Sequence, residues 1–280
     1  IASRNSMDLQ KIQSCVVPGD NIEQQGSDWK LGEVIVPAGT RVGAREMALL
    51  FEAGVKRVAG WASPRVAVVA TGSEITQEAD GLSSGFRRCS NASYIAALMS
   101  RIGVTDIRTI VVPDDIRQLT RTLVELDAVC DVIITVGGTG KGKRDYTRQA
   151  VSDAGGVFVG HDTQLDSPFV TARLPHAGLI GLPGNPLAVM MIVQCVLLES
   201  VRSVFHLPEA PAQTVEAVMT EDIEAGICGE LCVNVNESAA KPLIKGTGRM
   251  RVFDSARGFV RLNGQGIKRG ERVRVELFRN

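Results

Sequence analysis

Continuous apolar runs alternate with amphipathic segments through the middle of the chain. Each run has few polar residues inside it, as in strands that are covered on both faces of a sheet. The segments between the runs repeat their apolar residues with a helical period. The expected strands are 65–72, 107–115, 131–138, 157–160 and 177–182, and the expected helices are 91–104, 116–129, 144–156 and 186–205. This alternation predicts an α/β fold of three layers, in which helices cover both faces of a mostly parallel sheet.

Different patterns flank this region, so the sequence divides into three parts. Residues 1–64 carry Pro and Gly every few positions, which predicts a β-rich lead-in of short strands and turns with one helix at 44–55. Residues 65–206 form the expected α/β domain. Residues 207–280 have short alternating runs between Gly and Asn turns, and this pattern predicts a small antiparallel β domain.

The charge balance gives no sign of a nucleic-acid or membrane partner. The chain contains 31 Lys and Arg against 31 Asp and Glu, so its formal net charge is zero. The longest apolar stretch, 187–198, is shorter than the roughly 20 residues that span a bilayer, and it predicts a buried helix. The cysteines are scattered without a C-x-x-C pair, which favours reduced thiols and a cytoplasmic location over disulfides or a metal site.

Unusual residues follow four of the expected strands. Ligands of open α/β sheets bind just beyond the carboxyl ends of the strands, so these residues are candidates for one shared site. They are Thr71, Gly72 and Glu74 after the first strand, Asp114 and Asp115 after the second, Gly137, Gly138, Thr139, Gly140, Lys143 and Asp145 after the third, and Pro183, Gly184, Asn185 and Pro186 after 177–182.

These residue types suit a ligand that carries a phosphate. Glycines after a strand let backbone amides approach an anion, the next helix N-terminus adds a favourable dipole, and Lys143 adds countercharge. The carboxylates of Glu74, Asp115 and Asp145 are too many for a bare phosphate. They suit Mg²⁺ that bridges carboxylate and phosphate oxygens, or a polar heterocycle. The glycines have neither the P-loop nor the dinucleotide-binding spacing.

Each motif also has a purely structural explanation. A glycine pair after a strand often makes only a turn, and Asp114 and Asp115 could cap the next helix. The sequence PGNP could be a turn into a helix that starts at Pro186. Glu74 could be a solvated loop acid. The functional interpretation rests on all four motifs meeting at one edge of one sheet.

The motifs, in their order along the chain, resemble the molybdopterin-binding domain of molybdenum cofactor biosynthesis proteins. The stretches are TGSE, SNASYIAALMSRIG, VVPDD, DVIITVGGTGKGKRDYT and GLPGNP. Residues 19–58 resemble the lead-in of molybdopterin molybdenumtransferases. Residues 245–277 resemble their C-terminal β domain. The resemblance extends to the related C-terminal region of gephyrin.

This resemblance implies an enzyme that takes adenylylated molybdopterin and molybdate, removes AMP and leaves molybdenum on the dithiolene, with Mg²⁺ in support. It implies catalytic roles for Glu74, Asp115 and Asp145, of which Asp115 and Asp145 would hold the metal. It also implies a homodimer. The residues that it assigns to the pterin and its phosphate are Thr71, Gly72, Gly137, Gly138, Thr139, Gly140, Lys143, Pro183, Gly184, Asn185 and Pro186.

Departures from the family pattern keep other functions open. Where the family has a lysine-bearing stretch, this chain has the residues 164–168, QLDSP, and the aspartate before the S-N pair is replaced by Cys89. The GGTG motif followed by RD-x-T resembles instead the branch that attaches AMP to molybdopterin. The alternatives are therefore a molybdopterin adenylyltransferase, or a non-catalytic protein that carries or senses the pterin.

Overall fold

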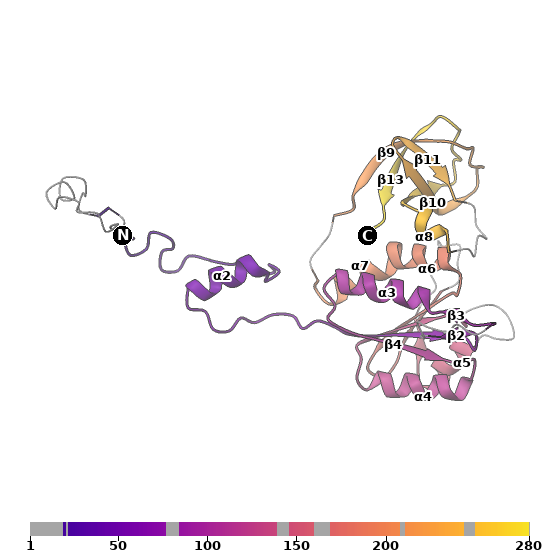
Figure 1. Ribbon diagram of the computed structural model, residues 1–280, viewed down its shortest axis with the longest axis horizontal. Helices are drawn as coiled ribbons and strands as arrows, with labels where there is room; N and C mark the ends of the chain where they lie inside the picture. The colour runs from indigo at the N-terminus through magenta and orange to yellow at the C-terminus, as the bar shows by residue number, and fades with distance from the viewer. Residues whose placement is uncertain are drawn as a thin grey trace. The chain divides into compact units, whose positions relative to one another are not determined.

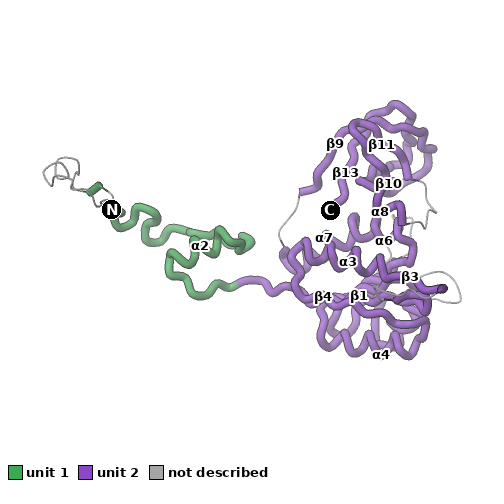
Figure 2. The backbone as a smooth tube through the Cα atoms, viewed as in Figure 1, with its two compact units in different colours: residues 1–59 green, residues 60–280 purple. Residues whose placement is uncertain are grey.

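The structure is a computed structural model of the chain. It describes residues 19–20, 22–76, 84–138, 146–159, 169–207, 211–243 and 250–279. The predictions for Thr139, Gly140, Lys143 and Asp145, and for residues 164–168, lie outside the described residues. The chain forms two compact units, residues 1–59 and 60–280, and each is described by itself (Figure 2).

A six-stranded sheet forms the middle layer of residues 65–206, with the strand order β4-β1-β5-β8-β7-β6. The strands β4, β1, β5 and β8 are parallel, and β7 and β6 add an antiparallel edge. Their bounds are Arg65–Thr71 for β1, Asp106–Val112 for β4, Val132–Val136 for β5, Val157–Phe158 for β6, Val170–Arg173 for β7 and Gly178–Leu182 for β8. The prediction of a mostly parallel sheet is confirmed.

Helices cover both faces of this sheet, which confirms the three-layer arrangement. The helix α3 (Ser90–Arg101) and the helical stretch from Pro186 to Val204 pack on one face. The helices α4 (Ile116–Asp127) and α5 (Tyr146–Asp153) pack on the other. Successive residues of β1 contribute to opposite cores, since Val66, Val68 and Ala70 belong to the first and Ala67 and Val69 to the second.

Three strands within residues 65–206 were not predicted from the sequence. The strand β7 is short and only two of its residues are buried, so its apolar signal is weak. The other two, β2 (Ile75–Thr76) and β3 (Arg87–Arg88), pair only with each other. Their pairing joins segments that lie apart in the sequence, and no local sequence pattern predicts it.

The helical stretch after Pro186 is buried on two sides. It consists of α6 (Pro186–Ile192), a π-helical turn η1 (Val193–Leu197) and α7 (Leu198–Val204). One side packs on the sheet, and Leu187, Met190 and Met191 pack on the C-terminal domain (Figure 1). Among the described residues, this stretch alone is long and apolar enough to cross a membrane, but 61% of it is buried inside the protein. Its apolar character on all sides is that of a core helix, as predicted.

The C-terminal domain is a closed barrel with the strand order β10-β11-β9-β13-β12, and its own core lies inside. The strands are β9 (Thr214–Met219), β10 (Cys228–Asn236), β11 (Ala239–Pro242), β12 (Gly258–Asn263) and β13 (Arg272–Leu277), and a short helix α8 (Val252–Ser255) precedes β12. The small β domain is confirmed. Its pairs are antiparallel except for β11 with β9.

The first unit contains the predicted helix, α2 (Ala44–Glu52), which Gly54 follows with a positive φ of 73°. The short strands expected in the lead-in are absent from residues 19–20 and 22–64. These residues form turns and extended segments instead. A strand needs a hydrogen-bonded neighbour, and spacing of Pro and Gly marks turns without supplying that neighbour.

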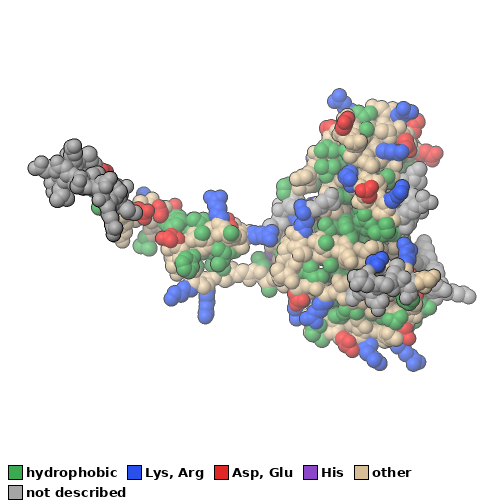
Figure 3. All heavy atoms as spheres, viewed as in Figure 1, with side chains coloured by type: hydrophobic (Ala, Val, Ile, Leu, Met, Phe, Trp, Pro, Cys, Tyr) green, Lys and Arg blue, Asp and Glu red, His purple; other side chains and the backbone are tan. Residues whose placement is uncertain are grey.

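Charged side chains of both signs are interspersed over the face of residues 60–280 in Figure 3.

The free cysteines in the described part of the chain are Cys89, Cys130, Cys195, Cys228 and Cys232.

Gln194 ties the barrel to the helix that it packs on. Its amide nitrogen donates to the Tyr94 hydroxyl and to the Arg279 carbonyl, both at 3.0 Å, and its amide oxygen accepts from the Arg279 backbone N–H at 3.0 Å. Gln194 is only 7% exposed, and burial raises the pKa of Tyr94 to about 12. Removal of the amide would leave buried polar groups without partners.

We therefore expect Gln194→Ala to lower the free energy of unfolding by about 1–3 kcal/mol in urea denaturation. Gln149→Ala is the matched control, because the Gln149 side chain is exposed and, within the described part of the chain, bonds only Asp153 of α5. The control should change stability by less than about 0.5 kcal/mol. Equal effects of the two variants would contradict a tie between helix and barrel.

Candidate functional site

A cavity of about 310 Å³ lies beyond the carboxyl ends of β1 and β5. The candidate residues that line it are Thr71, Gly72, Glu74, Gly137, Gly138, Gly184 and Pro186. Asp114, Arg87, Arg88, Cys89, Ser90, Asn91 and Met250 also line it. The structure therefore brings residues from all four strand-end motifs to one place. We call this the strand-end cavity.

Glu74 and Arg87 are held next to each other by the β2–β3 pair. The Arg87 N–H donates to the Glu74 carbonyl at 2.7 Å, and the Cys89 N–H donates to the Thr76 carbonyl at 3.1 Å. The Arg87 side chain makes no ion pair with the described residues. A guanidinium is always charged and presents a fork of donors, so Arg87 is available to an anion in the cavity.

Asp114 and Asp115 have different surroundings although they are neighbours in the sequence. The Ser73 N–H donates to Asp114 Oδ2 at 3.3 Å, and the Asp114 N–H donates to Ser73 Oγ at 3.1 Å. This reciprocal pair joins the ends of β1 and β4 and leaves Asp114 on the cavity wall. Asp115 Oδ1 accepts from the Gln118 N–H at 2.9 Å, so this carboxylate caps α4 and does not line the cavity.

The glycine pair after β5 is required by packing. Gly137 and Gly138 have φ of 100° and 66°. A Cβ on Gly137 would lie 2.7 Å from Thr71 Oγ1, and one on Gly138 would lie 2.7 Å from Thr147 Oγ1. The Gly137 N–H donates to the Leu182 carbonyl at 2.9 Å, so this amide is not available to an anion. The Gly137 amide is therefore not one of the backbone donors expected for a phosphate, and contact of the other amides of the glycine turn with a phosphate stays a prediction.

The PGNP motif forms the turn into α6, which was the structural explanation given for it above. The Asn185 side chain accepts from the N–H groups of Leu187 and Ala188, and Pro186 occupies the first turn. Gly184 and Pro186 still line the strand-end cavity. Pro183 and Asn185 are outside its lining.

Asn91 joins two motifs of the site and has an unused acceptor. Its Nδ2 donates to the Gly184 carbonyl at 3.0 Å. Its Oδ1 is buried and has no partner among the described residues. Buried acceptors in proteins are nearly always satisfied by protein or water, so this oxygen is an acceptor that a ligand N–H in the cavity can use. The cap position of α3 is Cys89, which makes no side-chain cap bond.

Cys89 lines the cavity where an acid is typical of the family that the sequence resembles. The pKa of the Cys89 thiol is raised, mainly because the side chain is buried. The thiol is therefore neutral near pH 7 and supplies no countercharge to a metal.

Two carboxylates, those of Glu74 and Asp114, are on the cavity wall. The described residues contain no group of three or more His, Cys, Asp or Glu side chains that could hold a metal ion by themselves. Mg²⁺ is commonly bound by one or two carboxylates together with substrate phosphates. Glu74 and Asp114 fit that arrangement.

Arg87, Asn91 and Asp114 are the residues of this site to which sequence reasoning gave no ligand contact of their own. A signal for Arg87 was present, since Arg87 and Arg88 lie just before Cys89 and the S-N motif. Cations are disfavoured beside a helix N-terminus, so positive charge there favours an anion nearby.

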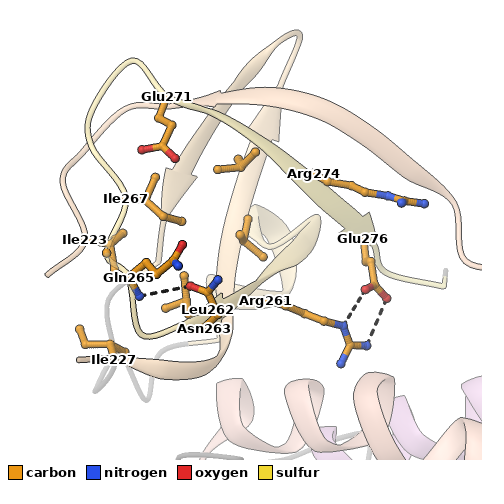
Figure 4. A pocket seen from close by; sticks show the side chains of 13 residues that line it. Ile223, Ile227, Arg261, Leu262, Asn263, Gln265, Ile267, Glu271, Arg274 and Glu276 are labelled. Atoms are coloured by element: carbon orange, nitrogen blue, oxygen red, sulfur yellow. Dashed lines mark hydrogen bonds and ion pairs between the residues drawn. The ribbon is translucent and has the colours of Figure 1, made fainter. Parts of the chain in front are cut away.

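A further cavity of about 320 Å³ lies in the C-terminal barrel (Figure 4). Apolar side chains such as Ile223, Ile267 and Val273 line it, and Arg261 pairs with Glu276 beside it at 2.7 Å. It shares no residue with the strand-end cavity.

Comparison with known proteins agrees with the geometry. Residues 67–203 match the family described as a probable molybdopterin binding domain. A molybdopterin molybdenumtransferase of Bacillus subtilis is 31% identical over 208 residues, which are 73% of this chain and 48% of the relative. That of Haemophilus influenzae is 27% identical over 175 residues, 62% of this chain and 43% of the relative.

Residues 67–203 match a molybdopterin-binding domain, and the chain is similar to molybdopterin molybdenumtransferases over 62–73% of its length. A molybdopterin biosynthesis MoeA protein of Pyrococcus horikoshii has the same fold, with a TM-score of 0.73 at 23% identity over 88% of this chain and 62% of that one. The chain spans about half the length of the curated relatives that it matches.

The glycine pair of the family motif gives a direct test of packing. We expect Gly137→Ala to destabilise the protein by about 2 kcal/mol or more, because its Cβ would collide with Thr71 and its φ is positive. The matched control is Gly184→Ala. Gly184 lines the same cavity, but a Cβ added at this position would meet no atom within 4 Å. That variant should stay within about 0.5 kcal/mol of the parent in urea denaturation. Equal stability of the two would contradict the packing requirement.

Proposed function

We propose that this chain acts in molybdenum insertion. It binds adenylylated molybdopterin and molybdate, supports release of AMP and leaves molybdenum on the dithiolene. The observation that carries the proposal is the strand-end cavity, in which a charged arginine, two carboxylates and an unsatisfied buried acceptor converge. The match of residues 67–203 to a molybdopterin-binding domain, and the similarity to molybdopterin molybdenumtransferases, support the choice of ligand.

Each side chain has a role that follows from its chemistry. Arg87 binds a phosphate or molybdate oxygen through charge-assisted hydrogen bonds. This matters because residues 164–168 carry no lysine. Asn91 Oδ1 accepts from an amino or ring N–H of the pterin. Asn91 is fixed for this task by its bond to Gly184.

Glu74 and Asp114 would hold Mg²⁺ together with phosphate oxygens. The ion would supply positive charge that offsets repulsion between these carboxylates and the phosphates. Asp115 and Asp145 remain predicted ligands on the resemblance alone, and so do the catalytic roles of Glu74, Asp115 and Asp145. The cap bond of Asp115 makes Asp114 the better ligand of the neighbouring pair.

The proposal includes a homodimer and a cytoplasmic location, as the resemblance and the scattered thiols led us to expect. The relatives compared above carry the molybdenumtransferase name, so the adenylyltransferase alternative is not favoured.

Titration with adenylylated molybdopterin, Mg²⁺ and molybdate tests the reaction. We expect AMP release that requires molybdate, measured by chromatography of the nucleotide. Release without molybdate would contradict insertion. Tight binding of molybdopterin without any release would replace the enzyme by a carrier or sensor of the pterin.

The anion contact is tested by Arg87→Ala. We expect it to weaken binding of molybdopterin by about tenfold or more, because a hydrogen-bonded charge contributes about 1.5–3 kcal/mol. The matched control is Arg272→Ala, an exposed arginine on β13 that lines neither cavity. Calorimetric titration should give the control the parent affinity. Parent affinity in Arg87→Ala as well would contradict the assignment.

A further inference from the structure

The strand β4 forms one edge of the six-stranded sheet. Among the described residues it pairs with β1 and with no other strand. It has seven residues and contains neither proline nor glycine. An edge of this length presents backbone N–H and C=O groups with which another strand can pair. The opposite edge strand, β6, has only two residues, and very short edge strands are a usual protection against such pairing.

The side chains of β4 are incompletely covered. Val112 is its only buried residue, whereas five of the seven residues of β1 are buried. Ile107 packs against the core on the α3 face, and Ile110 packs against the core on the α4 face, but both are only half-buried. A further strand beside β4 would remove the remaining apolar surface from water.

The sequence around Ile107 is complementary to itself when it is read in the opposite direction. Residues 105–109 read TDIRT. In an antiparallel pair of two copies centred on Ile107, Thr105 lies opposite Thr109, and Asp106 lies opposite Arg108. Ile107 lies opposite its own copy. Pairs of threonines and pairs of opposite charges both stabilise neighbouring antiparallel strands, and the two isoleucines bury apolar surface.

Neighbouring registers lack this complementarity. A pair centred on Arg108 places two guanidinium groups opposite each other, and one centred on Asp106 does the same with two carboxylates. Like charges directly opposite each other are destabilising. A pair centred on Thr109 places Arg108 opposite Ile110. The charges therefore favour the register that is centred on Ile107.

The two charged side chains are accessible from the edge. The side chains of Asp106 and Arg108 are 46% and 50% exposed, and Asp106 Oδ1 lies 3.7 Å from Arg108 Nε. Arg65, which is opposite Asp106 on β1, is bound to Asp131 at 2.8 Å. A guanidinium has five N–H donors, so Arg108 can also bind a carboxylate across the edge.

We propose that β4 binds β4 of a second copy of this chain, as an antiparallel pair centred on Ile107. The two six-stranded sheets then form one continuous sheet across a two-fold axis, which is the commonest symmetry of protein oligomers. The proposal commits to a second copy because the strand is complementary to itself. It does not depend on the proposed function.

Two charge variants and their mixture test the contact. Arg108→Asp makes both charged positions of the edge acidic, and Asp106→Arg makes both basic. Each variant alone should dimerise about tenfold or more weakly than the parent in analytical ultracentrifugation, since each repulsive pair occurs twice across the axis. An equal mixture should recover a heterodimer, because every acidic residue then faces a basic one. The ion pair within the chain is lost in both variants, so a contact between copies is what restores association.

Matched controls make the same charge changes away from β4. Arg272→Asp lies on β13 and Asp254→Arg on α8, and both parent side chains are exposed. Each control should dimerise as the parent does, and their mixture should show no preference for the heterodimer. Thermal unfolding shows whether each variant is folded, which is expected because these side chains lie at the surface.

Three outcomes would overturn the proposal. They are a parent chain that stays monomeric over the whole concentration range, a parent dimer that neither β4 variant weakens, and a loss of dimer in both variants without recovery in their mixture. The result is independent of AMP release. A heterodimer without AMP release leaves this surface standing and the function wrong, and AMP release from a monomer does the reverse.

Discussion

Burial of one helix on two sides is the constraint on which the rest of the second unit depends. The stretch from Pro186 to Val204 fills the space between the sheet and the C-terminal barrel, and it belongs to both cores. Apolar residues on all its sides make this possible. Its first turn, capped by Asn185, also forms part of the wall of the strand-end cavity. Packing of the barrel and geometry of the site are therefore coupled through a single rigid element.

The site combines fixed backbone with exposed charge. Its floor is set by the glycine turn after β5 and by the bond between Asn91 and Gly184, both of which have structural roles without a ligand. Its rim carries Glu74, Asp114 and Arg87, whose side chains are exposed. Opposite charges at one rim suit an anionic ligand that binds together with a cation. The arginine then pairs with the anion, and the carboxylates pair with the cation.

Much of the α/β fold could be predicted from the sequence because buried parallel strands such as β1 and β5 are continuous apolar runs. The meeting of four strand ends followed from that topology. The roles within the site were harder to predict. Asp114 and Asp115 are chemically identical neighbours, and only the turn of the backbone decides which one caps α4. Arg87 lies next to Glu74 because β2 pairs with β3. These two-residue strands are too short to show a hydrophobic period in the sequence.

The glycine turn has a consequence for reading variation within this family. In a library of variants grown without any ligand, Gly137 and Gly138 would still be retained, since Thr71 and Thr147 exclude a larger residue there. Invariance at these two positions is a signature of packing. The exposed side chain of Arg87 has no comparable duty in the fold, so constraint at that position would report chemistry. The best-preserved motif of such a domain and its most informative residue are then different parts of the chain.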